Sequence, residues 1–353
     1  MSTAVQPSKH DGLPKVAIFG AGSIGCYLGG QLASAGVPVR FIGRERFQTA
    51  LNEHGLTLTH YERSSISVSA DKFLFDVTPN NLVDADVILV TVKSQDTALA
   101  GQTIAQHAHP DALVVSIQNG IRNADLLRAE LPAATVLGGM VPFNVTGTGA
   151  GQFHCGTEGD LHVEYCDDAR LVSIQRSFQE AGQGCQLDSD IASVLWGKLL
   201  VNLNNAMNTL YGGTLKAGLM QRDYRLALAT MIQEALGVVR QTGIEPAKFG
   251  KATPEKMIRV LKLPNFLYGL IMNTVVKIDA TARSSMQDDL QAGRPPEVDF
   301  LQGEIVRLAE ATGQTAPVNQ CVLDLTHAAF KAGRSPGLSG KALLAAVKQA
   351  AKS

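Results

Sequence analysis

The stretch KVAIFGAGSIG, residues 15–25, decides the fold class of this chain. Its first five residues, Lys15–Phe19, form an apolar run rich in β-formers and predict a buried strand. A glycine turn follows, and apolar residues then recur at helical spacing from Ile24 to Ala35. Val37–Ile42 supplies a second strand. Strand, turn, helix and strand within about thirty residues predict a βαβ unit with a right-handed crossover.

The turn fits the pattern GxGxxG in the context that the pattern requires, after a strand and before a helix. In a dinucleotide site, Gly20 permits the tight turn, Gly22 lets the backbone approach a pyrophosphate, and Gly25 allows close helix–strand packing. The free N–H groups at the helix start, around Ser23 and Ile24, would face the phosphates. A turn that merely packs is the plain alternative, and the context favours dinucleotide binding.

The end of the second strand bears on the choice between NAD and NADP. An NAD enzyme usually places an acidic residue there, to bind the ribose hydroxyls. This chain has GRER at residues 43–46 instead, and Arg44 and Arg46 could hold a 2′-phosphate by charge-assisted contacts. Two solvated arginines beside Glu45 are the alternative. We expect NADPH as the cofactor.

The alternation of strands and helices continues over the first half of the chain. Runs rich in β-branched residues predict buried strands over Val87–Val92, Leu113–Ile117 and Thr135–Val141. Alternating apolar positions between Gly147 and Glu164 predict short antiparallel strands that close the sheet. This part of the chain is therefore expected to form a doubly wound α/β sheet of the Rossmann type.

After about Ser189, β-branched runs nearly vanish and apolar residues recur three and four positions apart. A last helix is expected after Ser339, with that serine as its N-cap. The predicted organisation is a flexible tail over residues 1–14, a dinucleotide-binding domain over 15–188 and an all-α substrate and catalytic domain over 189–353. The other helices predicted there are Leu195–Leu210, Tyr224–Thr242, Pro254–Leu261, Val298–Thr312 and Gln320–Ala332.

Composition and charge exclude several classes of function. The 353 residues include 31 basic and 32 acidic side chains, so no basic excess favours binding of nucleic acid or an anionic membrane. The five cysteines are scattered without metal-ligand spacing, so no metal site is expected. The start of the chain lacks an apolar signal core, and no apolar run reaches the length of a membrane span. We expect a cytoplasmic protein.

Three polar positions stand out among apolar residues. Lys93 follows a buried strand, and Asn119 follows the next one, where open α/β sheets bind ligands. Lys198 lies in an apolar helix with Asn202 one turn later on the same face. Each position has an ordinary interpretation, because strand ends are often polar, Asn-Gly is a common turn, and helix lysines are usually solvated.

Together these positions form part of a longer pattern. The motifs GxGxxG, VTVK, IQNG, LWGKLLVN, SSMQDD and EVDFLQGEI occur in this order. In this order they resemble the ketopantoate reductase (2-dehydropantoate 2-reductase) family, over about residues 15–332. The resemblance implies an enzyme that uses NADPH to reduce a small 2-oxo acid, 2-dehydropantoate, to pantoate on the route to pantothenate and coenzyme A.

The resemblance also assigns catalytic roles. Lys198 matches the general acid that protonates the oxygen of the reduced carbonyl, and Glu297 matches the glutamate that binds the substrate hydroxyl and helps to position the lysine. A nearby ammonium would stabilise the negative charge that develops on the oxygen. Partial burial should lower the lysine pKa and a carboxylate should raise it, which makes a near-neutral value plausible. Residues 295–296 are both proline, and we expect Glu297 in the first turn of the following helix.

The remaining matches concern binding. Asn119 matches an asparagine near nicotinamide and substrate, and Lys93 matches a lysine that lines the cofactor cleft. Asn202 and Ser285 match substrate-binding residues, with Ser285 expected at the carboxylate. Ser285 also opens a Ser-x-x-Asp pattern with Asp288, so a helix N-cap is its alternative role.

Departures from the family pattern leave the substrate open. Ala206 stands where the family commonly has the asparagine of an Asn-Pro pair, Lys216 aligns with a further substrate-side asparagine, and residues 248–272 exceed the family minimum. One alternative is therefore a reductase of another 2-oxo acid. A non-catalytic NADP-binding sensor is another, against which the retention of Lys198 and Glu297 argues. Analogy with related helical domains allows a homodimer.

Overall fold

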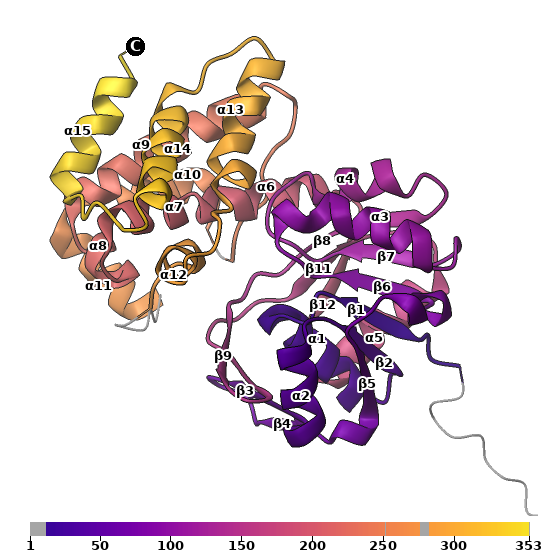
Figure 1. Cartoon of the computed structure of the whole chain (residues 1–353). Coiled ribbons are helices and arrows are strands. Elements are labelled where there is room, and N and C mark those ends of the chain that lie inside the picture. Colours follow the sequence, from indigo (N-terminus) through magenta and orange to yellow (C-terminus); the bar gives the residue numbers. More distant parts are fainter. Residues whose placement is uncertain (1–11, 251, 276–281, 353) are drawn as a thin grey trace, which may run out of the picture. The chain divides into compact units, whose positions relative to one another are not determined.

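The computed structural model describes residues 12–250, 252–275 and 282–352, and the chain divides into two compact units, Met1–Ile191 and Ala192–Ser353 (Figure 1). Residues 1–11 of the predicted tail lie outside the described residues. Each unit has its own core and is described separately.

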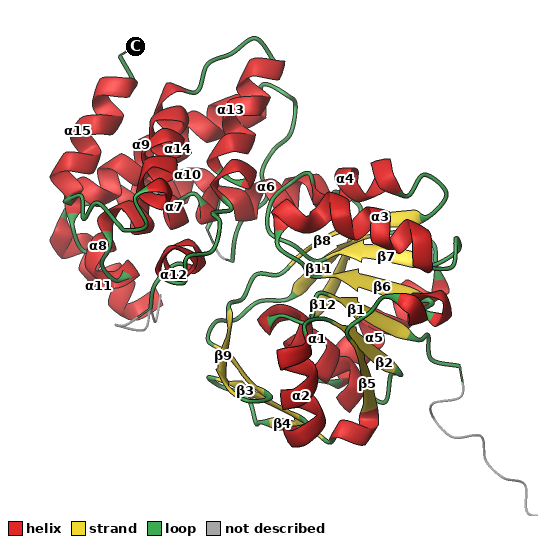
Figure 2. Ribbon diagram, viewed as in Figure 1, coloured by secondary structure: helices red, strands yellow, loops and turns green. Residues whose placement is uncertain are grey.

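Within the described residues, the first unit contains an eight-stranded sheet in the order β12-β11-β8-β7-β6-β1-β2-β5. The six strands from β5 to β8 run parallel in the Rossmann order, and β11 is antiparallel to β8 (Figure 2). This confirms the predicted doubly wound sheet. Its strands are β1 Val16–Phe19, β2 Val39–Ile42, β5 Phe73–Asp76, β6 Val87–Val90, β7 Leu113–Ser116, β8 Thr135–Met140, β11 Leu161–Glu164 and β12 Cys185–Asp188.

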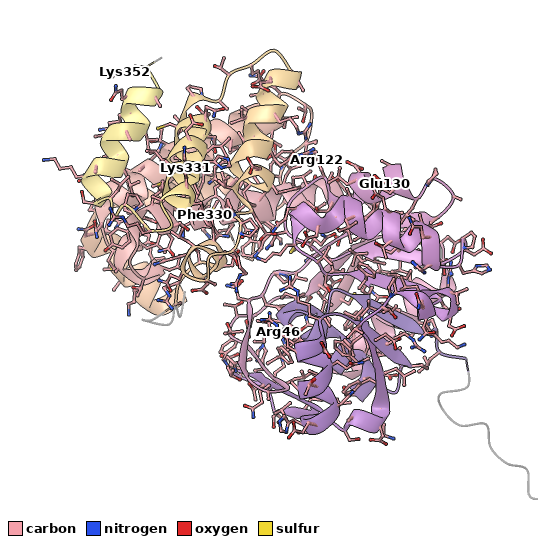
Figure 3. The ribbon with its side chains drawn as sticks, viewed as in Figure 1. Arg46, Arg122, Glu130, Phe330, Lys331 and Lys352 are labelled. Carbon is pink, nitrogen blue, oxygen red and sulfur yellow. The ribbon has the colours of Figure 1, made fainter. Side chains whose placement is uncertain are left out.

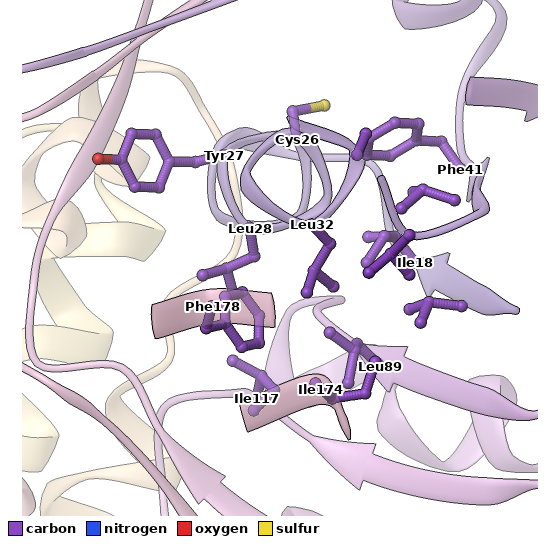
Figure 4. Close-up of a cluster of buried hydrophobic side chains, with 14 of the residues drawn as sticks. Ile18, Cys26, Tyr27, Leu28, Leu32, Phe41, Leu89, Ile117, Ile174 and Phe178 are labelled. Carbon is purple, nitrogen blue, oxygen red and sulfur yellow. The ribbon is translucent and has the colours of Figure 1, made fainter. Parts of the chain in front are cut away.

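Helices cover both faces of this sheet, and successive strand residues point to opposite faces, so that both sets of side chains are buried. Ile18 packs on one face with Leu28 and Leu32 of α1 (Ser23–Ser34), and α5 (Ala169–Glu180) joins the same cluster (Figure 4). Ala17, its neighbour in β1, packs on the opposite face under α3 (Thr97–His107) and α4 (Asn123–Glu130). Burial on both faces explains why these strands read as continuous apolar runs.

A second sheet, in the order β4-β3-β10-β9, packs against α1 and was not predicted. Its strands are β3 Leu56–His60, β4 Ile66–Val68, β9 Val145–Gly149 and β10 Gln152–Cys155. The prediction that all strands between Gly147 and Glu164 close the main sheet is therefore wrong for β9 and β10, and only β11 joins it. The reason lies in α1, whose residues Gly25–Ala33 are all buried. The main sheet covers one side of this helix, and the second sheet covers the side that faces away from it.

The second unit is built from helices, and no strand belongs to it among the described residues (Figure 2). The central helix is α9 (Arg222–Arg240), against which α10, α13, α14 and α15 pack. No helix in the described part of the chain is both long and apolar enough to cross a membrane. The other helices are α6 Ile191–Asn202, α7 Asn204–Tyr211, α8 Leu215–Leu219, α10 Pro254–Leu261, α11 Asn265–Val275, α12 Ser285–Gln291, α13 Gln302–Ala311, α14 Pro317–Lys331, α15 Gly340–Ala350 and the 3₁₀ turn η4 Val298–Phe300.

Three helix predictions can be compared in detail. Ser339 is the N-cap of α15, where its hydroxyl accepts a hydrogen bond from the N–H of Ala342, as predicted. The single helix predicted over Leu195–Leu210 is wrong, because the chain breaks between α6 and α7 at Leu203. The helix predicted over Val298–Thr312 begins instead as η4, and α13 starts only at Gln302.

Candidate functional site

The glycine turn after β1 is held by close packing on the neighbouring strand end. Gly20 has a positive φ of 111°, and a Cβ there would lie 2.7 Å from the backbone nitrogen of Val92. A Cβ on Gly25 would collide with the Gly20 carbonyl oxygen and lie 2.7 Å from the Thr91 hydroxyl. That hydroxyl donates a hydrogen bond of 2.7 Å to the Gly20 carbonyl. Gly20 and Gly25 are therefore both required by the turn itself.

Gly22 differs from these two glycines. A Cβ there would find no atom within 4 Å, and the φ of Gly22 is an ordinary −89°. The fold therefore leaves open space over Gly22, directly before Ser23 begins α1. Free N–H groups at a helix start, beside backbone that a ligand can approach closely, suit a phosphate group. The residues of this turn fit the pyrophosphate of a dinucleotide.

The two candidate arginines lie at the start of α2 (Glu45–His54). Arg44 is exposed and occupies the N-cap position of the helix. Arg46 lies over the ring of Phe47, with its guanidinium carbon 5.0 Å from the ring centroid, on the N-terminal unit (Figure 3). Arg46 and Phe47 line a hollow of about 360 Å³ together with Ser23 and the glycine-rich β9–β10 turn. Arg46 and Ser23, the first residue of α1, thus line the same hollow, whereas Arg44 does not line it.

Lys93 and Asn119 follow neighbouring strands, β6 and β7, and the structure ties their loops together. Lys93 is half-buried and Asn119 is exposed. The Ser94 hydroxyl donates a hydrogen bond of 2.8 Å to the Asn119 carbonyl. The amide of Asn123 donates to the same carbonyl at 2.5 Å. The carboxyl ends of the two strands therefore present these side chains from one connected edge.

Sequence reasoning missed the buried polar network beneath this edge. Gln118 donates a hydrogen bond of 3.0 Å to the Val92 carbonyl and one of 2.7 Å to the hydroxyl of Thr97. Thr97 in turn donates to the Asn123 side chain at 2.9 Å. Ser94, Thr97, Gln118 and Asn123 are all buried. The sequence offered one indication of this network, because each of the four residues lies within four positions of Lys93 or Asn119.

Lys198 lies on α6 and is half-buried. Its ammonium nitrogen is 4.9 Å from the centroid of the Phe249 ring. Burial lowers the pKa of Lys198 from the ordinary lysine range to about 8, because desolvation disfavours the charged form. The lowering expected from burial is confirmed, and the raising effect expected from the Glu297 carboxylate stays a prediction. A lysine with this pKa is protonated at neutral pH and still gives up its proton readily.

Glu297 is buried, with 6% of its surface exposed, and occupies the N-cap position of η4. The prediction that it lies in the first turn of a long helix is wrong, because a separate 3₁₀ turn intervenes before α13. Gln302 links this segment to the lysine helix: its side-chain amide donates a hydrogen bond of 2.8 Å to the carbonyl of Leu203, 99 residues away. Leu203 directly follows Asn202, the last residue of α6, which is itself buried.

Ser285 is exposed and is the first residue of α12, and the alternative N-cap role proposed for it is wrong. The N-cap is Ser284, whose hydroxyl accepts a hydrogen bond of 3.2 Å from the N–H of Gln287. The N–H of Ser284 donates to the side-chain oxygen of Asn208 at 2.9 Å, and its hydroxyl donates to the carbonyl of Asn205 at 3.2 Å. Ser284 thus fastens α12 to α7 and leaves the Ser285 side chain at the surface.

The three motifs of the second unit are therefore linked along α6 and α7. LWGKLLVN ends at the junction of the two helices, EVDFLQGEI is bonded to that junction through Gln302, and SSMQDD is bonded to α7 through Ser284. The half-buried ammonium of Lys198, the buried carboxyl of Glu297 and the exposed hydroxyl of Ser285 therefore lie on segments that are joined to one another by hydrogen bonds.

Comparison with known proteins agrees with this arrangement. The family model "Ketopantoate reductase PanE/ApbA" matches residues 16–168, and its C-terminal counterpart matches residues 190–330. The chain belongs to the ketopantoate reductase family. As a member of this family it is an oxidoreductase that acts on a CH–OH group.

Individual relatives of this ketopantoate reductase family member cover most of its length. A 2-dehydropantoate 2-reductase from Pyrococcus abyssi is 29% identical over 316 residues, which are 86% of this chain and 94% of that protein. The crystal structure of a PanE/ApbA family ketopantoate reductase from Ralstonia eutropha JMP134 has a TM-score of 0.77 and 28% identity, covering 90% of this chain and 99% of the other. D-mandelate dehydrogenase with NADH and anilino(oxo)acetate shares the fold, with a TM-score of 0.74, 20% identity, and coverage of 90% and 99%.

Two departures from the family motif have clear positions in the structure. Ala206, in place of the asparagine of the Asn-Pro pair, lies fully buried in α7. Lys216 is exposed on α8. The first position thus holds an apolar side chain in the interior of the second unit, and the second holds a solvated charge.

Proposed function

We propose that this protein catalyses the NADPH-dependent reduction of 2-dehydropantoate to pantoate, the reduction step in pantothenate and coenzyme A biosynthesis. The observation that carries the proposal is Lys198, a half-buried lysine with a pKa of about 8 on the motif helix of a ketopantoate reductase family member. This lysine is suited to act as the acid of a carbonyl reduction.

The first unit would hold the dinucleotide. The turn from Gly20 to Gly25 would bind the pyrophosphate, with the N–H groups at Ser23 and Ile24 as donors. Lys93 and Asn119, on the connected edge of β6 and β7, would contact the nicotinamide half. When bound, the reduced nicotinamide would supply a hydride to the carbonyl carbon of the substrate.

The second unit would supply the proton and bind the substrate. Lys198 would donate a proton from Nζ to the carbonyl oxygen as negative charge develops there. Glu297 would accept a hydrogen bond from the substrate hydroxyl and help to position the lysine. The amides of Asn119 and Asn202 would orient the substrate, and the Ser285 hydroxyl would donate to its carboxylate. The product is the 2-hydroxy acid.

The decisive assay follows NADPH absorbance with 2-dehydropantoate, a panel of other 2-oxo acids, and NADH in place of NADPH. We expect turnover of 2-dehydropantoate, and Lys198→Ala should lower kcat by about 100-fold or more while changing NADPH affinity little. A large loss of cofactor binding in this variant would contradict the catalytic role. NADPH binding without turnover of any acid would favour a sensor instead.

Cofactor preference has its own test. Arg44→Ala should weaken binding of NADPH by about 10- to 100-fold and binding of NADH by much less, because only NADPH carries the 2′-phosphate. Arg176→Ala, which removes an exposed arginine on α5, is the matched control. Calorimetric titration measures both affinities, and an equal loss for the two cofactors would refute the assignment. The same experiment on Arg46→Ala shows whether the arginine of the hollow shares this role.

A second candidate keeps the reaction and changes the acid. The departure that motivates it is Ala206, an apolar residue buried in α7 at the position where the family motif has an amide. Activity of the panel acids above that of 2-dehydropantoate would select this candidate.

We also propose a cytoplasmic protein that forms a homodimer. All five cysteines are free in the described structure, which suits a reducing compartment. Light scattering on the purified protein would report a monomer if the dimer proposal is wrong.

A further inference from the structure

The loop before α10 lies directly against the motif helix α6. The N–H of Ala247 donates a hydrogen bond of 2.8 Å to the carbonyl of Ser193. A Cβ on Gly197 would collide with the Ala247 carbonyl oxygen, so the glycine of the WGK motif permits this approach. The backbone of the loop is therefore in contact with α6 at the residue immediately before Lys198.

Two residues further along, the loop is fixed again. Phe249 and Ala252 form an isolated antiparallel bridge, with hydrogen bonds of 3.0 Å and 3.2 Å between their backbone groups. Gly250, between them, has a φ of +59°, as a tight turn requires. Hydrogen bonds thus hold the loop backbone at Ala247 and again at Phe249, whose ring is half-buried.

The Phe249 ring lies against the ammonium that the reaction needs. Its centroid is 4.9 Å from Lys198 Nζ, inside the distance of about 6 Å at which an aromatic face attracts a cation. A leucine of similar apolar character would pack on the lysine stem and lack this attraction. Phe249 belongs to residues 248–272, the segment that is longer than the family minimum. It therefore lies outside the motifs that this chain shares with the family.

We propose that Phe249 is a positioning residue of the reaction, whose ring holds the Lys198 ammonium in the orientation from which it donates its proton. This inference rests on the proposed function. Phe249 is not assigned any bond-making role: the proton passes from Lys198 to the substrate oxygen, and the ring acts only through the lysine.

The kinetic test compares Phe249→Leu with Phe249→Tyr, which retains the ring. Phe249→Leu should lower kcat by about 5- to 30-fold, the equivalent of one partly desolvated cation–aromatic contact. KM for the 2-oxo acid and the affinity for NADPH should stay within about twofold, and Phe249→Tyr should recover kcat. Phe266→Leu removes an aromatic ring that is 80% exposed on α11 and should have no effect. An unchanged kcat in Phe249→Leu, or an equal loss in Phe249→Tyr, would overturn the proposal.

A spectroscopic test does not depend on activity. In protein labelled with ¹³C-lysine, the Lys198 signal is identified by its absence from Lys198→Met. The ring should shift its ε-methylene protons upfield, and the shift should vanish in Phe249→Leu and persist in Phe249→Tyr. Absence of the shift from the native protein would refute the contact. A retained shift in a protein that reduces no 2-oxo acid would reject the proposed function while the contact itself stands.

Discussion

At the scale of single residues, Gly22 and Gly25 stand in the same turn, yet an added methyl group would meet different surroundings at each. At Gly25 it would meet the Gly20 carbonyl and the Thr91 hydroxyl, and at Gly22 it would meet open space. Gly25→Ala should therefore lower the free energy of unfolding by about 1–3 kcal/mol, because the turn must move. Gly22→Ala should leave stability unchanged and weaken NADPH binding by about tenfold or more, because the methyl group occupies the approach of the phosphates.

Thermal unfolding and calorimetric NADPH titration of the two variants measure these effects. The pair serves as its own control, since the substitutions are chemically identical. Native NADPH affinity in Gly22→Ala would show that no ligand approaches the turn there.

Residue-scale prediction from sequence succeeded where a residue acts through its own local environment. The lowered pKa of Lys198 follows from its place among apolar helix residues, which the sequence displays. The N-cap of α12 was misplaced by one residue, because the choice of Ser284 over Ser285 depends on Asn205 and Asn208, almost eighty positions away. Local patterns do not contain that information.

At the scale of elements, the break between α6 and α7 shows the same limit. Apolar periodicity runs on from Leu195 to Leu210 and predicts one helix, yet the chain turns at Leu203. At this break the buried side chain of Gln302 donates a hydrogen bond to the Leu203 carbonyl. A helix break that is satisfied by a distant residue cannot be predicted from the helix alone.

This bond gives a prediction for Gln302→Leu. The variant keeps the approximate size of the side chain and removes the amide group that donates a hydrogen bond to the Leu203 carbonyl. We expect a loss of about 1–3 kcal/mol in the free energy of unfolding, together with a fall in kcat, because the Glu297 segment is no longer fastened to the end of the lysine helix. Urea denaturation and steady-state kinetics measure the two effects. Gln241→Leu, an exposed glutamine at the end of α9, is the control, and a Gln302→Leu protein as stable and active as the native one would contradict this role.

At the scale of the whole molecule, the sequence predicted the doubly wound sheet and the helical second half, because buried parallel strands and amphipathic helices carry strong local patterns. The second sheet escaped prediction because it joins β3 and β4 to β9 and β10, some ninety residues apart along the chain. This sheet packs on the side of α1 that faces away from the main sheet, and that packing is apparent only once the whole unit is assembled.

The partly desolvated ammonium of Lys198 has a consequence for the stability of the whole protein. Its pKa is about 8 in the folded state and higher when the chain is unfolded, so at pH 7 the native state carries the cost of a partly desolvated charge. Between these two pKa values the unfolded state binds more protons, and this group therefore makes the native protein more stable as pH rises. Lys198→Met should accordingly be more stable than the native protein at pH 7, by about 1–3 kcal/mol, while losing activity.

The difference between variant and native protein should shrink as pH rises from 8 towards 10, because the native lysine then loses its charge. The single tryptophan, Trp196, is buried in α6 two residues before Lys198, so its fluorescence during urea denaturation reports on the unit that contains the lysine. Lys256→Met, at an exposed lysine of α10, should show no such dependence on pH. Two outcomes would contradict the lowered pKa of Lys198. One is a Lys198→Met protein with no higher free energy of unfolding than the native protein at pH 7, and the other is a difference in that free energy that grows with pH.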